Sequence, residues 1–161
     1  MSGTDSEIGP ARPDELDAVR ALYRDYRAYI ESLYPFRPFD DEEIAALPGR
    51  YRLLALRRNH QVAGCVAWHE WSDGIAEMKR LYVHPAARAQ GDGRRLIESV
   101  ITEVHALGYR TLRLDTLEAM TSAIALYRRL GFTEIANYHG HPLPWALFFE
   151  LRLTRSDSTP A

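Results

Sequence analysis

Apolar and polar residues alternate along this chain with two different spacings, which predict helices in some segments and strands in others. Apolar residues three or four positions apart, together with capping residues and Pro or Gly at the ends, predict helices over 13–33, 40–48, 96–107 and 121–130. Strands are predicted over 51–56, 62–69, 75–83, 111–115, 132–135 and 147–153. The first two of these strands are close enough to form a hairpin through residues 58–60.

The order of these elements, with one more strand at the start, is β-α-α-β-β-β-α-β-α-β-β and shows no repeat or linker. It predicts a mixed α/β fold in a single domain over residues 1–161. The strand–helix–strand unit from 75 to 115 should contain two parallel strands. The polar ends, residues 1–6 and 155–161, are expected to be disordered.

A glycine-containing segment, Arg88-Ala89-Gln90-Gly91-Asp92-Gly93, lies between the strand over 75–83 and the helix that follows it. Backbone N–H groups at such a helix start, with the helix dipole, form a seat for phosphate. On its own the motif also fits an ordinary strand–helix turn without a ligand. A Rossmann site would have an early G-x-G-x-x-G loop, and a P-loop would have Gly-Lys-Ser/Thr, so neither matches.

Two segments in the same order resemble the GNAT superfamily of N-acetyltransferases, over roughly residues 8–153. The first runs from Glu77 through Pro85 and the glycine-containing loop to Leu96, and the second is Ala-Ile-Ala-Leu-Tyr-Arg-Arg-Leu-Gly-Phe from Ala123 to Phe132. The resemblance implies a central mixed, mostly antiparallel sheet of six to seven strands with about four flanking helices. It also implies that the phosphorylated ligand is acetyl-CoA, used as co-substrate to acetylate an amine.

The resemblance also assigns the residues that would hold acetyl-CoA. They are a backbone stretch for the pantetheine arm, Leu81, Tyr82 and Val83, and a pyrophosphate loop, Arg88, Ala89, Gln90, Gly91, Asp92, Gly93 and Arg94. Three residues depart from the family pattern. Ala89 stands where relatives usually have Gly, Met120 where many have a pantetheine-binding Asn, and Asp92 where an aliphatic residue is common. The Asp92 carboxylate would oppose phosphate if it pointed inward, or could instead bind nearby N–H groups or Arg94 and Arg95.

Glu77 and Tyr127 are the candidate catalytic residues. A substrate amine of pKa near 10.4 is protonated at pH 7, and removing its proton costs roughly 4–5 kcal/mol. Glu77 is the candidate base, and the alternative is a solvated acid paired with a neighbouring Lys79 or Arg80. Tyr127 is the candidate acid for the CoA thiolate, and the alternative is a core tyrosine. Backbone N–H groups from 81 to 83 could polarise the thioester carbonyl.

Four aromatic residues are candidates for binding the amine acceptor, namely Tyr29, Tyr34, Phe36 and Tyr138. They favour a small acceptor with an apolar or aromatic part, although the same residues could simply pack in the core and loops. Asp115 ends a parallel strand on the expected ligand side, or else neutralises Arg113 or Arg110. No metal is expected, because His139 and His141 have no Cys or carboxylate at ligand spacing in the sequence.

Charge and cysteine content restrict the remaining possibilities. The net charge of −2 over 161 residues gives no support to nucleic-acid or membrane binding. The single cysteine, Cys65, lies in an apolar strand and excludes an internal disulfide, which suggests a cytoplasmic protein. A homodimer is plausible from family habit alone. The sequence therefore predicts an enzyme that transfers acetyl groups in a ternary complex, with a non-catalytic acyl-CoA-binding or interaction module as the alternative.

Overall fold

The computed structural model describes residues 6–154, and the described residues form two compact units. Unit 1 combines the first part of the chain, to His69, with residues 80–100, and unit 2 combines 70–79 with the part from Ile101 onward. The prediction of one domain is not tested by this division and remains a prediction. Most of the two tails expected to be disordered lies outside the described residues, whereas Ser6 begins a strand.

Unit 1 contains β1 (Ser6–Pro10), β2 (Arg52–Arg58) and the part of β3 (Gln61–Ser72) that ends at His69, and these strands are antiparallel. The predicted hairpin is confirmed. Its turn residues Asn59 and His60 both have positive φ, at 52° and 65°, which is the backbone that a two-residue hairpin turn needs. Strands β2 and β3 extend beyond their predicted ends at the hairpin turn, because Arg57 and Arg58 continue the hydrogen-bonded pairing between them.

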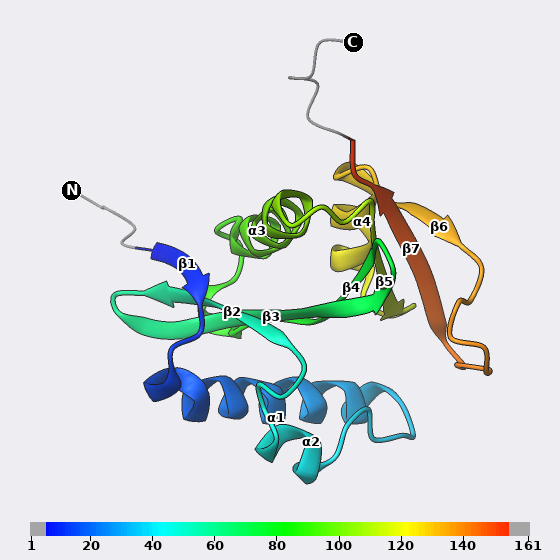
Figure 1. Cartoon of the computed structure of the whole chain (residues 1–161). Coiled ribbons are helices and arrows are strands. Elements are labelled where there is room, and N and C mark those ends of the chain that lie inside the picture. The colour runs from blue at the N-terminus through cyan, green and yellow to red at the C-terminus, as the bar shows by residue number, and fades with distance from the viewer. Residues whose placement is uncertain (1–5, 155–161) are drawn as a thin grey trace. The chain divides into compact units, whose positions relative to one another are not determined.

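Helices α1 (Leu16–Leu33) and α2 (Asp41–Ala45) also belong to unit 1, and Figure 1 shows them together below β2 and β3. A single 3₁₀ turn precedes α1, in place of the helical first turn that was predicted there. The Asp40 carboxylate caps α2 by accepting from the Glu43 N–H. The apolar faces of both helices enter one buried cluster, made of Val19, Leu22, Tyr23, Phe39, Ile44, Leu47, Leu53, Cys65, Ala67 and Tyr82.

Strand β4 (Ile75–Val83) has the predicted bounds, because Gly74 and Pro85 delimit it. It pairs in parallel with β5 (Thr111–Leu117) over Ile75 to Met78, as the strand–helix–strand prediction requires. Helix α3 (Asp92–Ala106) connects them and begins four residues before its predicted start. Asp92 and Gly93 are therefore residues of the first helical turn and not of the preceding loop.

Unit 2 ends with α4 (Thr121–Arg129), β6 (Thr133–Ile135) and β7 (Ala146–Arg152). Strand β7 is antiparallel to both β5 and β6. Thr121 was predicted to cap α4, but Met120 occupies the N-cap position and offers no capping hydrogen bond. The β7 strand passes α4 in Figure 1, and its Phe149 ring lies 6.1 Å from the Tyr127 ring of that helix.

The hydrogen-bonded strand order among the described residues is β1-β2-β3-β4-β5-β7-β6, with only the β4–β5 pair parallel among the pairings given above. The predicted fold class, a mixed and mostly antiparallel sheet with four helices, is confirmed. No helix in the part of the chain that the structure describes is long and apolar enough to cross a membrane.

Candidate functional site

Glu77 is the buried centre of a polar cluster in unit 2. Ala76, Glu77 and Met78 are buried in succession, so both faces of β4 are covered here, and Glu77 has no exposed surface. The Tyr138 hydroxyl donates a hydrogen bond of 2.6 Å to Glu77 Oε2. The alternative reading of this position was a solvated acid paired with Lys79 or Arg80. The burial of Glu77 contradicts the solvation, whereas the ion pair with Lys79 is found.

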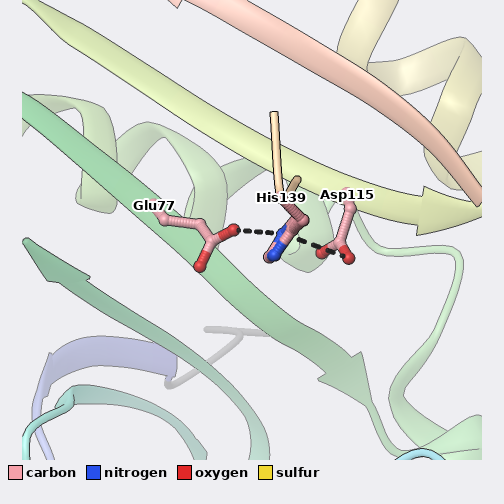
Figure 2. A group of neighbouring side chains, drawn as sticks. All are labelled: Glu77, Asp115 and His139. Atoms are coloured by element: carbon pink, nitrogen blue, oxygen red, sulfur yellow. Dashed lines mark ion pairs between the residues drawn. The ribbon is translucent and has the colours of Figure 1, made fainter. Parts of the chain in front are cut away.

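Asp115 and His139 complete the cluster, as Figure 2 shows. Asp115 comes from β5, and His139 from the segment between β6 and β7. His139 Nε2 lies 3.0 Å from Glu77 Oε2 and 3.7 Å from Asp115 Oδ2, so the imidazole stands between the two carboxylates. The side chains of His139 and Asp115 are 12% and 25% exposed, which makes Asp115 the most solvent-accessible of the three.

Lys79 supplies a positive charge to the same cluster. It follows Glu77 by two residues and so lies on the same face of β4, with Nζ 3.8 Å from both Glu77 Oε1 and Asp115 Oδ1. With His139 neutral, the group then carries one net negative charge, and the ammonium compensates part of the cost of burying two carboxylates. Asp115 was alternatively expected to neutralise Arg113 or Arg110. Arg113 instead donates to Glu150 Oε1.

Each of Glu77, Asp115 and His139 offers one ligand atom, and these atoms lie within 4.8 Å of one another. The sequence argument against a metal was that no carboxylate accompanies the histidines, and that argument is wrong, because the fold supplies two from neighbouring strands. The Lys79 ammonium lies 3.8 Å from one oxygen of each of these carboxylates, so a cation of the protein itself already compensates part of their charge. The absence of a metal remains a prediction.

Aromatic side chains hold the cluster in place. The Tyr138 ring stacks on His139 at 4.8 Å and 27°, while Trp71 meets the His139 ring edge-on at 4.8 Å. The Arg113 guanidinium lies 5.1 Å from the centre of the Tyr138 ring. Burial, and then the negative charge of Glu77, raise the pKa of the Tyr138 hydroxyl well above its ordinary value, so this hydroxyl remains a hydrogen-bond donor.

The predicted phosphate loop lies in unit 1, and residues 88–91 are exposed. Ala89 and Gly91 have φ of 68° and 79°, so Ala89 holds the left-handed backbone that the usual Gly adopts freely. Among the described residues, none is recorded as accepting a hydrogen bond from the N–H groups of residues 89–94. Arg88 Nε donates to the Val83 carbonyl, which ties the loop to the end of β4. The loop therefore has free donors and open space.

Asp92 does not face this loop. Its side chain is 1% exposed and accepts from Arg58 Nε at 2.6 Å and from Arg95 Nη1 at 3.2 Å. Of the two partners suggested by the sequence, Arg95 is found, whereas Arg94 pairs with Glu98 instead. No pattern in the sequence indicated Arg58, at the end of β2, as a partner of Asp92.

Tyr127 is buried in unit 2, where its ring lies 5.7 Å from Phe132 and 6.1 Å from Phe149. This packing fits the alternative of a core tyrosine without testing a role of its hydroxyl.

His84 is exposed, and its Nδ1 accepts from the Ala86 N–H, as expected of a residue at a strand end.

The aromatic residues suggested for acceptor binding are placed in two units. Tyr29 is 42% exposed on α1, and Tyr34 is buried against Phe36 with ring centres 5.8 Å apart, all in unit 1. Tyr138 belongs to unit 2 and is the one among them that reaches Glu77. The structure thus brings one predicted acceptor-binding residue together with the predicted base.

Arg80 is a feature that the sequence did not indicate. It has φ of 58° within β4, an unusual backbone for a non-glycine residue. Its guanidinium lies 4.6 Å from the Phe39 ring centre and 5.7 Å from that of Tyr51, and 4.0 Å from Glu43. These ring contacts offset part of the cost of the strained backbone.

Comparison with known proteins identifies the family of this chain. The model of the acetyltransferase (GNAT) family matches residues 16–132. The chain is 32% identical to an uncharacterised N-acetyltransferase of Schizosaccharomyces pombe over 149 residues, which is 89% of this chain and 91% of that protein. It is 36% identical to an IAA acetyltransferase of Azospirillum brasilense over 138 residues, 83% of this chain and 90% of that protein.

A solved structure of an acetyltransferase from Salmonella typhimurium, yncA with its cofactor acetyl-CoA, has the same fold. Its TM-score is 0.75 at 24% identity, and the match covers 97% of this chain and 98% of that one. The match to the family model spans more than half of the chain and includes Glu77, the loop over 88–93 and Tyr127. The chain therefore belongs to the GNAT family of acetyltransferases and is an N-acetyltransferase.

Proposed function

We propose that this enzyme transfers the acetyl group of acetyl-CoA to a primary amine of a small molecule or peptide, directly and within a ternary complex. The observation that carries the proposal is the 2.6 Å hydrogen bond from Tyr138 to the fully buried Glu77. It joins a residue suited to contact the acceptor with a residue suited to remove a proton from it. A binding module would have no need of a buried carboxylate at this place.

The loop over 88–94 and the start of α3 fit the pyrophosphate of CoA. Several N–H groups there make no recorded hydrogen bond to a described residue, and a Cβ added at Gly91 would meet no atom within 4 Å. Such donors at a helix start favour a phosphate group. The backbone of Leu81, Tyr82 and Val83 lies beyond the four residues through which β4 pairs with β5, and it would hold the pantetheine arm. Acetyl-CoA supplies the thioester.

Glu77 accepts the proton of the amine in this proposal. Because Glu77 has no exposed surface, the amine contacts the Tyr138 oxygen, and the hydroxyl passes its own proton to Glu77 Oε2 as it takes one from the amine. The phenol thus remains neutral, in keeping with its raised pKa. Tyr127 donates the proton that the departing CoA thiolate requires and takes up the second proton that the amine nitrogen loses as the amide forms, so it returns to its starting form. The N–H groups between 81 and 83 polarise the thioester carbonyl.

The acceptor would have an apolar or aromatic part, because the residues proposed to contact it, Tyr29, Tyr34 and Phe36 in unit 1 and Tyr138 in unit 2, are all aromatic. The relative from Azospirillum brasilense is named an IAA acetyltransferase. That name does not select an acceptor for the present chain. The enzyme would act in the cytoplasm, where Cys65 remains reduced, and without a metal. A homodimer is the assembly to test first.

Thiol release from acetyl-CoA tests the proposal with tyramine, phenethylamine, L-phenylalanine, spermidine and an alanine-starting peptide as acceptors. We expect turnover with an aromatic amine, and a fall in kcat of about 100-fold or more for Glu77→Gln. Tyr138→Phe should lower kcat by about 10-fold or more.

Tyr109→Phe is the matched control, because Tyr109 likewise donates to a carboxylate, Glu70, but at an exposed position. Its kcat should equal that of the unmodified enzyme. Tight CoA binding without turnover of any acceptor would support a non-catalytic module instead. Turnover of spermidine alone would contradict the proposed acceptor class.

A further inference from the structure

The buried position of Glu77 leaves a proton to be removed after each reaction cycle. Acetylation of a protonated amine releases one proton in addition to the one that the CoA thiolate takes up. If Glu77 receives that proton, as the proposed function on which this inference rests requires, it must lose it before the next cycle. Glu77 has no exposed surface, so water has no direct access to its carboxyl group.

His139 provides the connection from Glu77 toward solvent. Its Nε2 is 3.0 Å from Glu77 Oε2 and 3.7 Å from Asp115 Oδ2, and Figure 2 shows the ring between the two carboxylates. Nε2 itself is buried and has no aligned hydrogen-bond partner among the described residues. The nitrogen nearest both carboxylates is therefore available to accept a proton.

Asp115 connects the path of the proton to solvent. Its side chain is 25% exposed, whereas that of Glu77 is not exposed at all. Lys79 lies 3.8 Å from an oxygen of each carboxylate, so its ammonium is equally close to both. Because the ammonium is equally close to the Glu77 and Asp115 carboxylates, the difference in their exposure sets the direction in which the proton moves.

We propose that Glu77, His139 and Asp115 form a proton exit, in which His139 carries the proton from the buried base to the surface. The O–H bond of protonated Glu77 breaks as an N–H bond forms at His139 Nε2. The N–H bond then breaks as an O–H bond forms at Asp115 Oδ2, and water takes the proton from Asp115. The neutral imidazole has its hydrogen on Nδ1, and each group ends in its starting form.

The charged and titratable groups that face His139 are those of the cluster and one neighbour. Glu77 and Lys79 come from β4, Asp115 from β5, Tyr138 is adjacent in sequence, and the His141 ring is 5.9 Å away. Trp71 and Tyr138 restrict the ring to small movements. Tyr138 and His139 lie beyond the residues that the family model matches.

Steady-state kinetics of His139→Asn, His139→Gln and Asp115→Asn test the proposal, with acetyl-CoA and the best amine of the panel above. We expect each to lower kcat by about 10- to 100-fold, with KM for acetyl-CoA changed less than about 2-fold. Added imidazole should restore the His139 variants, with a rate that depends on the pKa of substituted imidazoles. Because the residues act in series, His139→Asn/Asp115→Asn should lose no more than the worse single variant.

His141→Asn is the control, since His141 is exposed on the same segment and takes part in no step. Unchanged kcat in His139→Asn, loss without rescue by any imidazole in a folded variant, or multiplicative losses in the double variant would each overturn the proton exit. Unmodified enzyme that turns over shows that the proposed function stands whatever the His139 variants do.

A measurement without an acceptor keeps the inference testable even if no amine is turned over. The Nε2 resonance of His139 in ¹⁵N-histidine-labelled protein, identified by its loss in His139→Asn, should shift in both Glu77→Gln and Asp115→Asn. The His141 resonances should not change. If neither carboxylate substitution moves the Nε2 resonance, the imidazole does not connect the two groups and the proposal is wrong.

Discussion

Arg58 and Asp92 are 34 residues apart in the chain and meet in a two-point ion pair, with Nε 2.6 Å from Oδ2 and Nη2 3.0 Å from Oδ1. Asp92 begins α3, so its negative charge also faces the positive end of the helix dipole. Because Arg58 and Arg95 pair with the buried carboxylate, its charge is compensated within the protein. If the proposed phosphate site at this helix start is correct, Asp92 should therefore hold the loop in shape and not oppose the ligand.

Asp92→Asn should therefore destabilise the protein and weaken CoA binding together. Removing the carboxylate leaves the mostly buried Arg58 guanidinium without its partner, which costs about 2–4 kcal/mol, between the values for surface and buried pairs. Urea unfolding and calorimetric titration with CoA measure the two effects. Glu98→Gln, which breaks the exposed Arg94–Glu98 pair on the same helix, should change stability by less than about 0.5 kcal/mol.

The decisive result is the sign of the change in affinity. Asp92→Ile places the aliphatic residue common in relatives at this position. Tighter CoA binding by Asp92→Ile would show that the carboxylate opposes the pyrophosphate, contrary to its inward orientation in the structure.

Tyr127→Phe separates the proposed acid from a core tyrosine. The ring packs on Phe132 and Phe149, and phenylalanine retains those ring contacts. If the hydroxyl protonates the CoA thiolate, kcat should fall by about 10-fold or more with KM for acetyl-CoA nearly unchanged. An unchanged kcat would assign Tyr127 to packing alone.

Local patterns were sufficient to predict the elements that glycine and proline delimit. Strand β4 was predicted to the residue because Gly74 and Pro85 mark its ends. The start of α3 was not, because Gly91 and Gly93 suggested a longer loop, whereas the Asp92 ion pair stabilises the first turn. The partner of Asp92, Arg58, lies on the distant β2–β3 hairpin, so the residues around Asp92 do not indicate it.

The candidate site was predictable only one residue at a time. The family motif indicated Glu77, and the rule for parallel strands indicated the side of the sheet that Asp115 faces. Their convergence with Tyr138 and His139 depends on the path of the irregular segment between β6 and β7, which no periodicity describes. Alternation in β4 places Glu77 on the face opposite Ala76 and Met78, and the neighbouring charges favoured a solvated acid there. The fold covers both faces of the strand, so Glu77 is buried instead.

Cys65 should be unreactive in the folded protein. It is completely buried, and this burial raises the pKa of its thiol to about 12, so almost no thiolate forms at neutral pH. With 5,5′-dithiobis(2-nitrobenzoate) we expect no reaction in native buffer and one thiol per chain in 6 M guanidinium. Rapid labelling of the native protein would contradict the burial and would also interfere with thiol-release assays.

Glu15 should make the stability of the protein depend on acid pH. Arg57 contacts its carboxylate at 2.5 Å and 2.7 Å, and the hydrogen bond from this guanidinium lowers the pKa of Glu15 to about 2. Because the folded-state pKa lies below the unfolded value near 4.5, the stabilisation is complete above that value and is lost as pH falls toward 2. Its size is about 1–3 kcal/mol once screening by solvent is included.

Urea unfolding from pH 7 to pH 2 measures this dependence in the unmodified protein and in Glu15→Gln. At pH 7 the variant should be less stable, because Arg57 loses its charged partner, and the difference between the two proteins should narrow below about pH 4.5. Asp17→Asn is the control, since Asp17 pairs with Arg20 at an almost fully exposed position and should leave the slope unchanged. A constant difference between Glu15→Gln and the unmodified protein over the whole range would show that Glu15 keeps an ordinary pKa in the folded state.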